Sequence, residues 1–262
     1  MMGVDSIAEA IKSVNKDIKI SALVDSGFFA DYSSGLKEYD NTEPSSRKFM
    51  ESHGIFDPVN PHTMTLDYSY GMRNVFKMMN MSGGIDADCI EANKGKNGGD
   101  DCMFGSHLGL HVQTPMYILQ SKYDSWQIKH VVGKSKDLIT MNEFGKLILR
   151  DVEKVVGSVD MKNTEGMLHG GFVDSCTHHC AGCQADIWRY SYPNSLMSAA
   201  DGFSRWLEQH STINGVSVSS GYEKEIRSNS SLSFLTVQDQ LYPCEKCCGT
   251  CKLLPRSTTL PP

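Results

Sequence analysis

Apolar residues recur along this chain with two different periods. A spacing of three or four residues, typical of amphipathic helices, runs through four segments: 5–14, 66–79, 140–155 and 194–210. Short, mostly apolar runs, typical of buried strands, occupy three others: 18–24, 116–120 and 167–173. Thr140 is the expected cap of the third helix, because Glu143 follows it at the spacing of a capping box. The succession of these segments predicts an α/β fold.

The stretches between these segments carry residues that favour turns. Prolines interrupt residues 31–62, which are expected to be irregular, and Gly and Asp dominate residues 83–105, which are expected to form a loop. Residues 213–236 are rich in Ser and Gly, and no internal repeat is found. The expected division is an α/β body over 1–212, an exposed insertion over 213–240, and a closing cysteine cluster with its tail over 241–262.

Composition and charge narrow the function classes. The 262 residues are 40% hydrophobic and 21% charged, which is ordinary for a globular protein with a sizeable core. A net charge of −6 gives no electrostatic footprint for binding nucleic acid or an anionic membrane. No apolar run approaches the roughly 20 residues that a membrane-spanning helix needs. Asp5, Glu9 and Asp17 interrupt the opening of the chain, so no signal peptide is expected in it.

The nine cysteines are clustered, which suits disulfides or metal ligands better than scattered core thiols. The spacing Cys176-x3-Cys180-x2-Cys183 also occurs where three thiolates hold an iron–sulfur cluster. A second cluster near the C-terminus, over residues 244–251, has Cys-x2-Cys spacings that would bind zinc together with the first. From the residues alone, disulfides, zinc and iron–sulfur are all open.

Three motifs, each containing or following a strand-like run, carry further information. They are Ala22-Leu-Val-Asp-Ser-Gly-Phe-Phe-Ala-Asp31, then Thr114-Pro-Met-Tyr-Ile-Leu119 with Tyr123-Asp-Ser-Trp-Gln-Ile128, and then Gly171-Phe-Val-Asp-Ser-Cys-Thr-His-His-Cys180. In this order they resemble motifs of the pectin acetylesterase and Notum family of α/β-hydrolases. The resemblance runs from about residue 5 to residue 251, and the cysteine pair Cys89 and Cys102 agrees with it.

The resemblance implies catalytic roles for two residues. Asp124 falls at the family's triad aspartate and His179 at its triad histidine. The pair suits ester hydrolysis, because an imidazole can take the proton of an attacking serine and a carboxylate can orient that imidazole. Asp124 also follows a buried strand, which is where open α/β sheets place their sites. His178 stands beside His179, so which of the two is the base is open.

The serine of such a triad is missing from this sequence. The nucleophile elbow Gly-X-Ser-X-Gly does not occur in it. We therefore expect the C-terminal half of a three-layer α/β-hydrolase fold, with the nucleophile-bearing half absent and no ester turnover by the chain as given. The substrate pocket is expected to be walled by Phe28, Phe29 and Trp126.

The implied activity is that of a carboxylic ester hydrolase that deacetylates polysaccharide or deacylates protein. The resemblance further implies an extracellular or cell-wall location, with no cofactor and no metal. It also implies disulfides, for which the candidates are Cys89, Cys102, Cys176, Cys180, Cys183, Cys244 and Cys248. Two alternatives are a non-catalytic remnant that acts by binding a partner, and a zinc or iron–sulfur protein built on the cysteine clusters.

Overall fold

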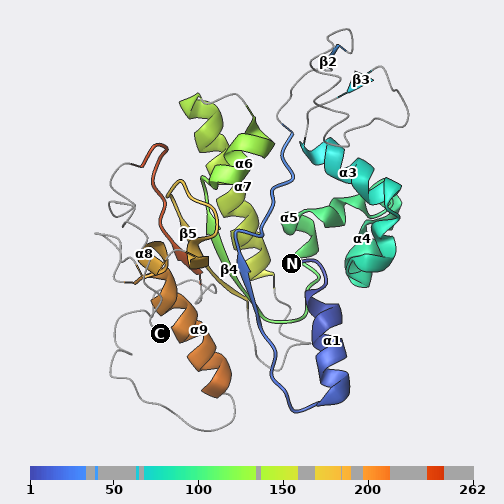
Figure 1. The fold of residues 1–262 in the computed structure, drawn as a ribbon, viewed down its shortest axis with the longest axis vertical. Coiled ribbons are helices and arrows are strands. Elements are labelled where there is room, and N and C mark those ends of the chain that lie inside the picture. Colours follow the sequence, from blue (N-terminus) through green and yellow to red (C-terminus); the bar gives the residue numbers. More distant parts are fainter. Residues whose placement is uncertain are drawn as a thin grey trace, which may run out of the picture.

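A four-stranded parallel sheet forms the centre of the molecule, in the order β1-β4-β5-β6 (Figure 1). The computed structural model describes residues 1–33, 39–40, 63–64, 68–133, 137–158, 169–183, 185–189, 197–212 and 235–244. The sheet strands are β1 (Ala22–Asp25), β4 (Met116–Ser121), β5 (Gly170–Asp174) and β6 (Leu235–Val237), and β2 (Tyr39–Asp40) pairs separately with β3 (Thr63–Met64). Because the four strands are parallel, their carboxyl ends all meet at one edge of the sheet.

The helices have the following bounds. They are α1 (Val4–Val14), α3 (Tyr68–Met78), α4 (Ala87–Asn97), α5 (Gly105–Leu108), α6 (Ser125–Gln127), α7 (Leu138–Gly157), α8 (Ala185–Trp188) and α9 (Ala199–Thr212). Short 3-10 turns are η1 (Met81–Gly84), η2 (Asp100–Met103) and η4 (Ala181–Cys183), and η3 (Ile128–Val132) is a π-helical turn.

The sheet lies between two helical layers. Every residue of β4 is buried, and its side chains alternate between the two faces. Met116 and Ile118 belong to the core that includes residues of α5 and α7, whereas Tyr117 and Leu119 belong to a second core with α8 and α9. Strand β4 is apolar on both faces because helices cover both, which explains why its sequence reads as a continuous apolar run. The expected α/β, three-layer arrangement is confirmed.

Close packing of α9 depends on a glycine. A Cβ atom at Gly202 would lie 2.4 Å from the hydroxyl oxygen of Tyr117, which is buried at 1% exposure. Trp206, one turn further along, is fully buried and packs its ring 5.5 Å from that of Tyr117. The two aromatic rings therefore fill the space between α9 and the sheet, and the missing side chain at position 202 lets the helix approach.

The segment 83–105 is largely helical, so the expectation of a loop is wrong. The Asp86 carboxylate caps α4 by accepting a hydrogen bond from the amide of Cys89 at 2.8 Å. A disulfide between Cys89 and Cys102 joins α4 to η2. The apolar residues of α4 do not recur at helical spacing, so the cap and the disulfide stabilise a helix that periodicity alone does not indicate.

Two further expectations are corrected. Asp137, not Thr140, caps α7, since its carboxylate accepts a hydrogen bond from the amide of Thr140 at 2.9 Å. Thr140 is thus the third residue of the helix. Strand β6 lies inside the expected insertion 213–240 yet pairs with β5, so that span contains a strand of the sheet. Residues 213–234, 245–262 and most of 31–62 lie outside the described residues.

One edge of the sheet carries exposed apolar side chains. Strand β1 is the end strand of the sheet within the described residues, and its Leu23 is 44% exposed. Helix α1, which precedes β1, exposes Ile7 at 61% and Val14 at 88%. No described helix combines the length and apolar character needed to cross a lipid bilayer.

Candidate active site

The centre of the site lies at the carboxyl end of β4. Asp124 follows this strand and is fully buried. Its Oδ1 atom accepts a hydrogen bond from the amide of Gln127 at 2.8 Å, so the carboxylate caps α6. One carboxylate oxygen therefore binds the backbone, which leaves the other oxygen for a second partner.

That second oxygen binds His179. Asp124 Oδ2 lies 2.7 Å from His179 Nδ1, and the imidazole is 31% exposed. The two turns are also joined by their backbones, because the amide of Ser125 donates to the carbonyl oxygen of His178 at 3.0 Å. A carboxylate on Nδ1 fixes the ring and favours the tautomer in which Nε2 can accept a proton. The geometry is that of a base and its orienting carboxylate.

The neighbouring histidine has a different environment. His178 is 7% exposed, and its Nε2 lies 2.9 Å from Oδ2 of Asp174, the last residue of β5. Burial opposes protonation of His178, but the Asp174 carboxylate outweighs it and raises the pKa of the imidazole. His178 thus forms an internal pair beneath the site, and of the two histidines His179 is the one that meets Asp124.

Aromatic side chains stand beside His179. The ring of Trp126 stacks against the imidazole at 6.4 Å, and Phe29 meets Trp126 edge-on at 5.3 Å. Tyr68, from α3, lies 5.9 Å from Trp126, and burial raises the pKa of its hydroxyl to about 12. Phe29, Tyr68 and Trp126 are partly exposed and make up the aromatic wall of the site. Phe28, which we expected in this wall, is instead fully buried in the core.

Comparison with known proteins identifies the family. The model of the Pectinacetylesterase family matches residues 1–249. The chain belongs to this family. It is similar to pectin acetylesterase 11 of Arabidopsis thaliana, at 31% identity over 137 residues, which is 46% of this chain and 34% of that protein. It is also similar to pectin acetylesterase 7 of the same plant, at 30% identity over 99 residues, or 33% of this chain and 25% of that protein.

The chain also resembles a protein of known structure. The Wnt deacylase Notum from Drosophila superposes with a TM-score of 0.54 at 15% identity, covering 80% of this chain and 50% of Notum. A second crystal form gives 0.52 at 17% identity, covering 82% and 50%. At these identities the likeness shows a shared fold. The chain spans half the length of Notum and no more than about a third of the curated relatives.

Two buried glutamines hold the segment that carries the aromatic wall against the Asp124 turn. Gln120 Oε1 accepts a hydrogen bond from the amide of Phe28 at 3.2 Å. Gln127 Nε2 donates to the carbonyl oxygen of Phe28 at 3.0 Å, and its Oε1 accepts from the amide of Ala30 at 3.1 Å. The amide of Gln127 also donates to Asp124, so one residue positions both the Asp124 carboxylate and the segment that carries Phe29.

An arginine clamp lies on α3, the helix that also carries Tyr68 of the aromatic wall. The Arg73 guanidinium donates to Asp31 at 2.6 and 3.0 Å and to Asp101 at 2.6 and 3.2 Å, and its Cζ atom lies 4.7 Å above the ring of Phe104. Burial opposes ionisation of Asp31, but hydrogen bonds from His107 and Arg73 hold its pKa well below the ordinary value. The clamp ties the segment after β1 to α3 and η2.

The cysteines that the structure describes divide into two groups. Besides Cys89 and Cys102, Cys176 and Cys244 are each disulfide-bonded, while Cys248 lies outside the described residues. A three-thiolate iron–sulfur site over residues 176–183 is therefore excluded, because the sulfur of Cys176 is already bonded.

Cys180 and Cys183, expected above among the disulfide cysteines, carry free thiols. Their sulfur atoms lie close to Asp25 rather than in a disulfide. Burial and the nearby Asp25 carboxylate raise the pKa of Cys180. The turn that carries His179 therefore ends in two thiols that face an acidic side chain.

Proposed function

We propose that this chain provides the histidine and aspartate of a Ser-His-Asp carboxylic ester hydrolase that removes acetyl groups from a polysaccharide. The observation that carries the proposal is the 2.7 Å contact between the buried Asp124 and His179 Nδ1. In this arrangement His179 Nε2 takes the proton of the attacking serine and returns it to the leaving alcohol. Asp124 holds the ring and stabilises the imidazolium that forms.

The nucleophilic serine, in this proposal, comes from outside these 262 residues. The sequence contains no Gly-X-Ser-X-Gly elbow. The exposed edge of β1, with Leu23 at its surface, offers a surface where a serine-bearing part of the fold would pack. We therefore expect the 262-residue chain by itself to hydrolyse no ester.

Sequence likeness and the aromatic wall support an acetylated polysaccharide as the substrate. The curated relatives are named pectin acetylesterases and are 31% and 30% identical, whereas the Notum chains are 15% and 17% identical. Phe29, Tyr68 and Trp126 present flat apolar rings next to the base. Such rings suit the apolar face of a sugar, because ligand sites are lined mainly by apolar and aromatic side chains.

Acetate release from acetylated pectin tests the proposal. In a protein that contains both this chain and the serine elbow, Asp124→Asn is expected to lower kcat by about 10⁴-fold, because the imidazole loses its orienting carboxylate. His179→Ala should have an effect at least as large. His111→Ala removes a partly buried histidine that is not part of the site, so it serves as the matched control and should retain full turnover.

Two results would count against the proposal. Near-normal turnover by His179→Ala would show that this imidazole is not the base. Ester turnover by the 262-residue chain, above that of its own Asp124→Asn variant, would show that a nucleophile is present within it.

A further inference from the structure

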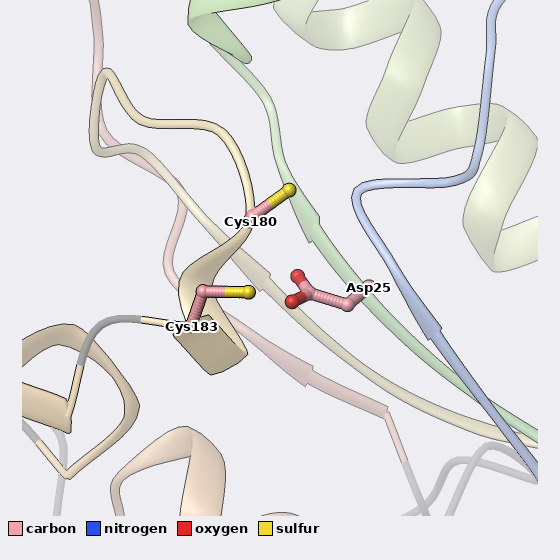
Figure 2. A group of neighbouring side chains, drawn as sticks. All are labelled: Asp25, Cys180 and Cys183. Atoms are coloured by element: carbon pink, nitrogen blue, oxygen red, sulfur yellow. The ribbon is translucent and has the colours of Figure 1, made fainter.

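Three side chains with metal-ligand chemistry meet beside the His179 turn. They are Asp25 at the end of β1, Cys180, and Cys183 at the end of η4. One ligand atom from each lies within 4.8 Å of the others. Figure 2 shows both sulfur atoms on the side of their turn that faces the Asp25 carboxylate. The proposed hydrolysis uses none of these three side chains.

The turn 180–183 is built around the Asp25 carboxylate. The amide of Gly182 donates to Asp25 Oδ2 at 3.0 Å, and the amide of Cys180 donates to the Ser26 hydroxyl at 2.8 Å. A Cβ atom at position 182 would lie 2.9 Å from Asp25 Oδ2, so glycine permits this approach. Cys180 has a φ of 59°, a conformation that residues other than glycine rarely adopt. Backbone contacts therefore hold the two thiols and the carboxylate together.

The charge around this trio favours a cation. Within the described ranges, no lysine, arginine or histidine forms an ion pair with Asp25. A second group of possible metal ligands consists of Asp31, Asp101 and His107. Its two carboxylates already pair with the Arg73 guanidinium. The trio around Asp25 has the ligand atoms of a metal site, and no ion pair with a described side chain occupies it.

We propose that Asp25, Cys180 and Cys183 bind a thiophilic divalent cation of the zinc type. Cys-x2-Cys spacing with a carboxylate is a ligand set that Zn²⁺ accepts, at distances of roughly 2.3 Å to sulfur and 2.0–2.2 Å to oxygen. Tetrahedral ligands at these lengths stand roughly 3.8 Å apart, which is within the observed separation limit of 4.8 Å. Cys183 is exposed, so water can occupy the fourth position.

Metal binding at this site would affect the neighbouring histidine turn. Both thiols lose their protons to solvent as the two metal–sulfur bonds form. The bound cation then links the end of β1 to the turn that begins one residue after His179. The bound cation would therefore fix this turn to the sheet.

Co²⁺ is a suitable probe because its spectrum reports both thiolate ligation and tetrahedral geometry. The 262-residue chain, purified under argon with its disulfides intact, should bind one Co²⁺ with a thiolate-to-cobalt charge-transfer band and tetrahedral d–d bands. Zn²⁺ should displace it. Cys183→Ser should weaken binding by roughly 100-fold or more, since loss of an outer-shell partner alone costs about 10–100-fold. Asp25→Asn should weaken binding but keep both thiolate contributions to the band.

Controls make the assignment specific. Asp17→Asn removes an exposed carboxylate in the loop before β1 and should leave the affinity unchanged. Undiminished Co²⁺ binding by Cys183→Ser would place the metal at other cysteines and overturn the proposal. A native disulfide between Cys180 and Cys183, found by mass spectrometry of the alkylated protein, would also overturn it. These readouts are spectroscopic, so they are independent of whether the chain takes part in ester hydrolysis.

Discussion

Arg73→Met is the substitution whose effect on stability follows most directly from the structure. The methionine keeps most of the apolar stem over Phe104 but removes the guanidinium from Asp31 and Asp101. The side chain of Asp101 is 9% exposed and that of Asp31 is 23% exposed. Removing one partner of a buried pair leaves the other charge desolvated, at a cost of about 3–5 kcal/mol. Partial exposure of Asp31 lowers this, so we expect a loss of about 3 kcal/mol at pH 7.

The expected loss of stability in Arg73→Met depends on pH, because the protonation of Asp31 differs between the folded and the unfolded protein. The pKa of Asp31 is lowered in the folded protein, so its contribution to the free energy of unfolding is fully present above about pH 4. As the pH falls further, the unfolded chain takes up the proton first and this contribution is progressively lost. The difference between wild type and Arg73→Met should therefore begin to shrink near pH 4 and keep shrinking as the pH falls towards the lowered pKa of folded Asp31.

Urea unfolding, followed by circular dichroism at several pH values, measures this difference. Arg150→Met is the matched control, because the Arg150 side chain is 70% exposed and its pair with Asp151 should contribute about 0–1 kcal/mol. A loss below 1 kcal/mol for Arg73→Met, or a loss that stays constant as the pH falls, would refute the reasoning.

Two further predictions concern packing and covalent links. Replacing both Cys89 and Cys102 by alanine removes a disulfide that spans a sequence separation of 13. This should lower the free energy of unfolding by about 3 kcal/mol, measured by urea unfolding. A loss below 1 kcal/mol would show that helix α4 does not depend on this link. Gly202→Ala places a Cβ 2.4 Å from the Tyr117 hydroxyl and should cost about 1–3 kcal/mol in thermal melts. Adding Tyr117→Phe removes that hydroxyl, which makes no hydrogen bond among the described residues, and should restore most of the lost stability. If the double variant is no more stable than Gly202→Ala alone, the clash is not the cause.

The elements that periodicity predicted well are those with strong local patterns. The run 116–120 became β4 almost unchanged, because a strand buried on both faces is apolar throughout. The helices α1, α3, α7 and α9 show helical spacing and were predicted to within a few residues, with α9 beginning five residues later than expected. Helix α4 was missed, because its cap and its disulfide stabilise it without an apolar stripe.

The site was harder to predict because its geometry depends on contacts between distant residues. Asp124 and His179 were named from a family resemblance, but no local signal distinguishes His179 from His178. The distinction comes from their partners, since Asp174 holds one imidazole and Asp124 holds the other. Tyr68 joined the aromatic wall through the folding of α3 against η3, and nothing in its own neighbourhood in the sequence indicates this.

The hydrogen bonds of Gln120 and Gln127 have a consequence for how the aromatic wall can change. The bonds that these two side chains make to residues 28–30 all go to the backbone and not to the side chain of Phe29. A residue of another size at position 29 would keep every one of these bonds, and with them the placement of the Asp124 turn. Mutational drift or directed evolution can therefore vary the shape of the wall at that position while Asp124 and His179 keep their positions. Replacing both Gln120 and Gln127 would remove these backbone bonds, and a change at position 29 would then also shift the Asp124 turn.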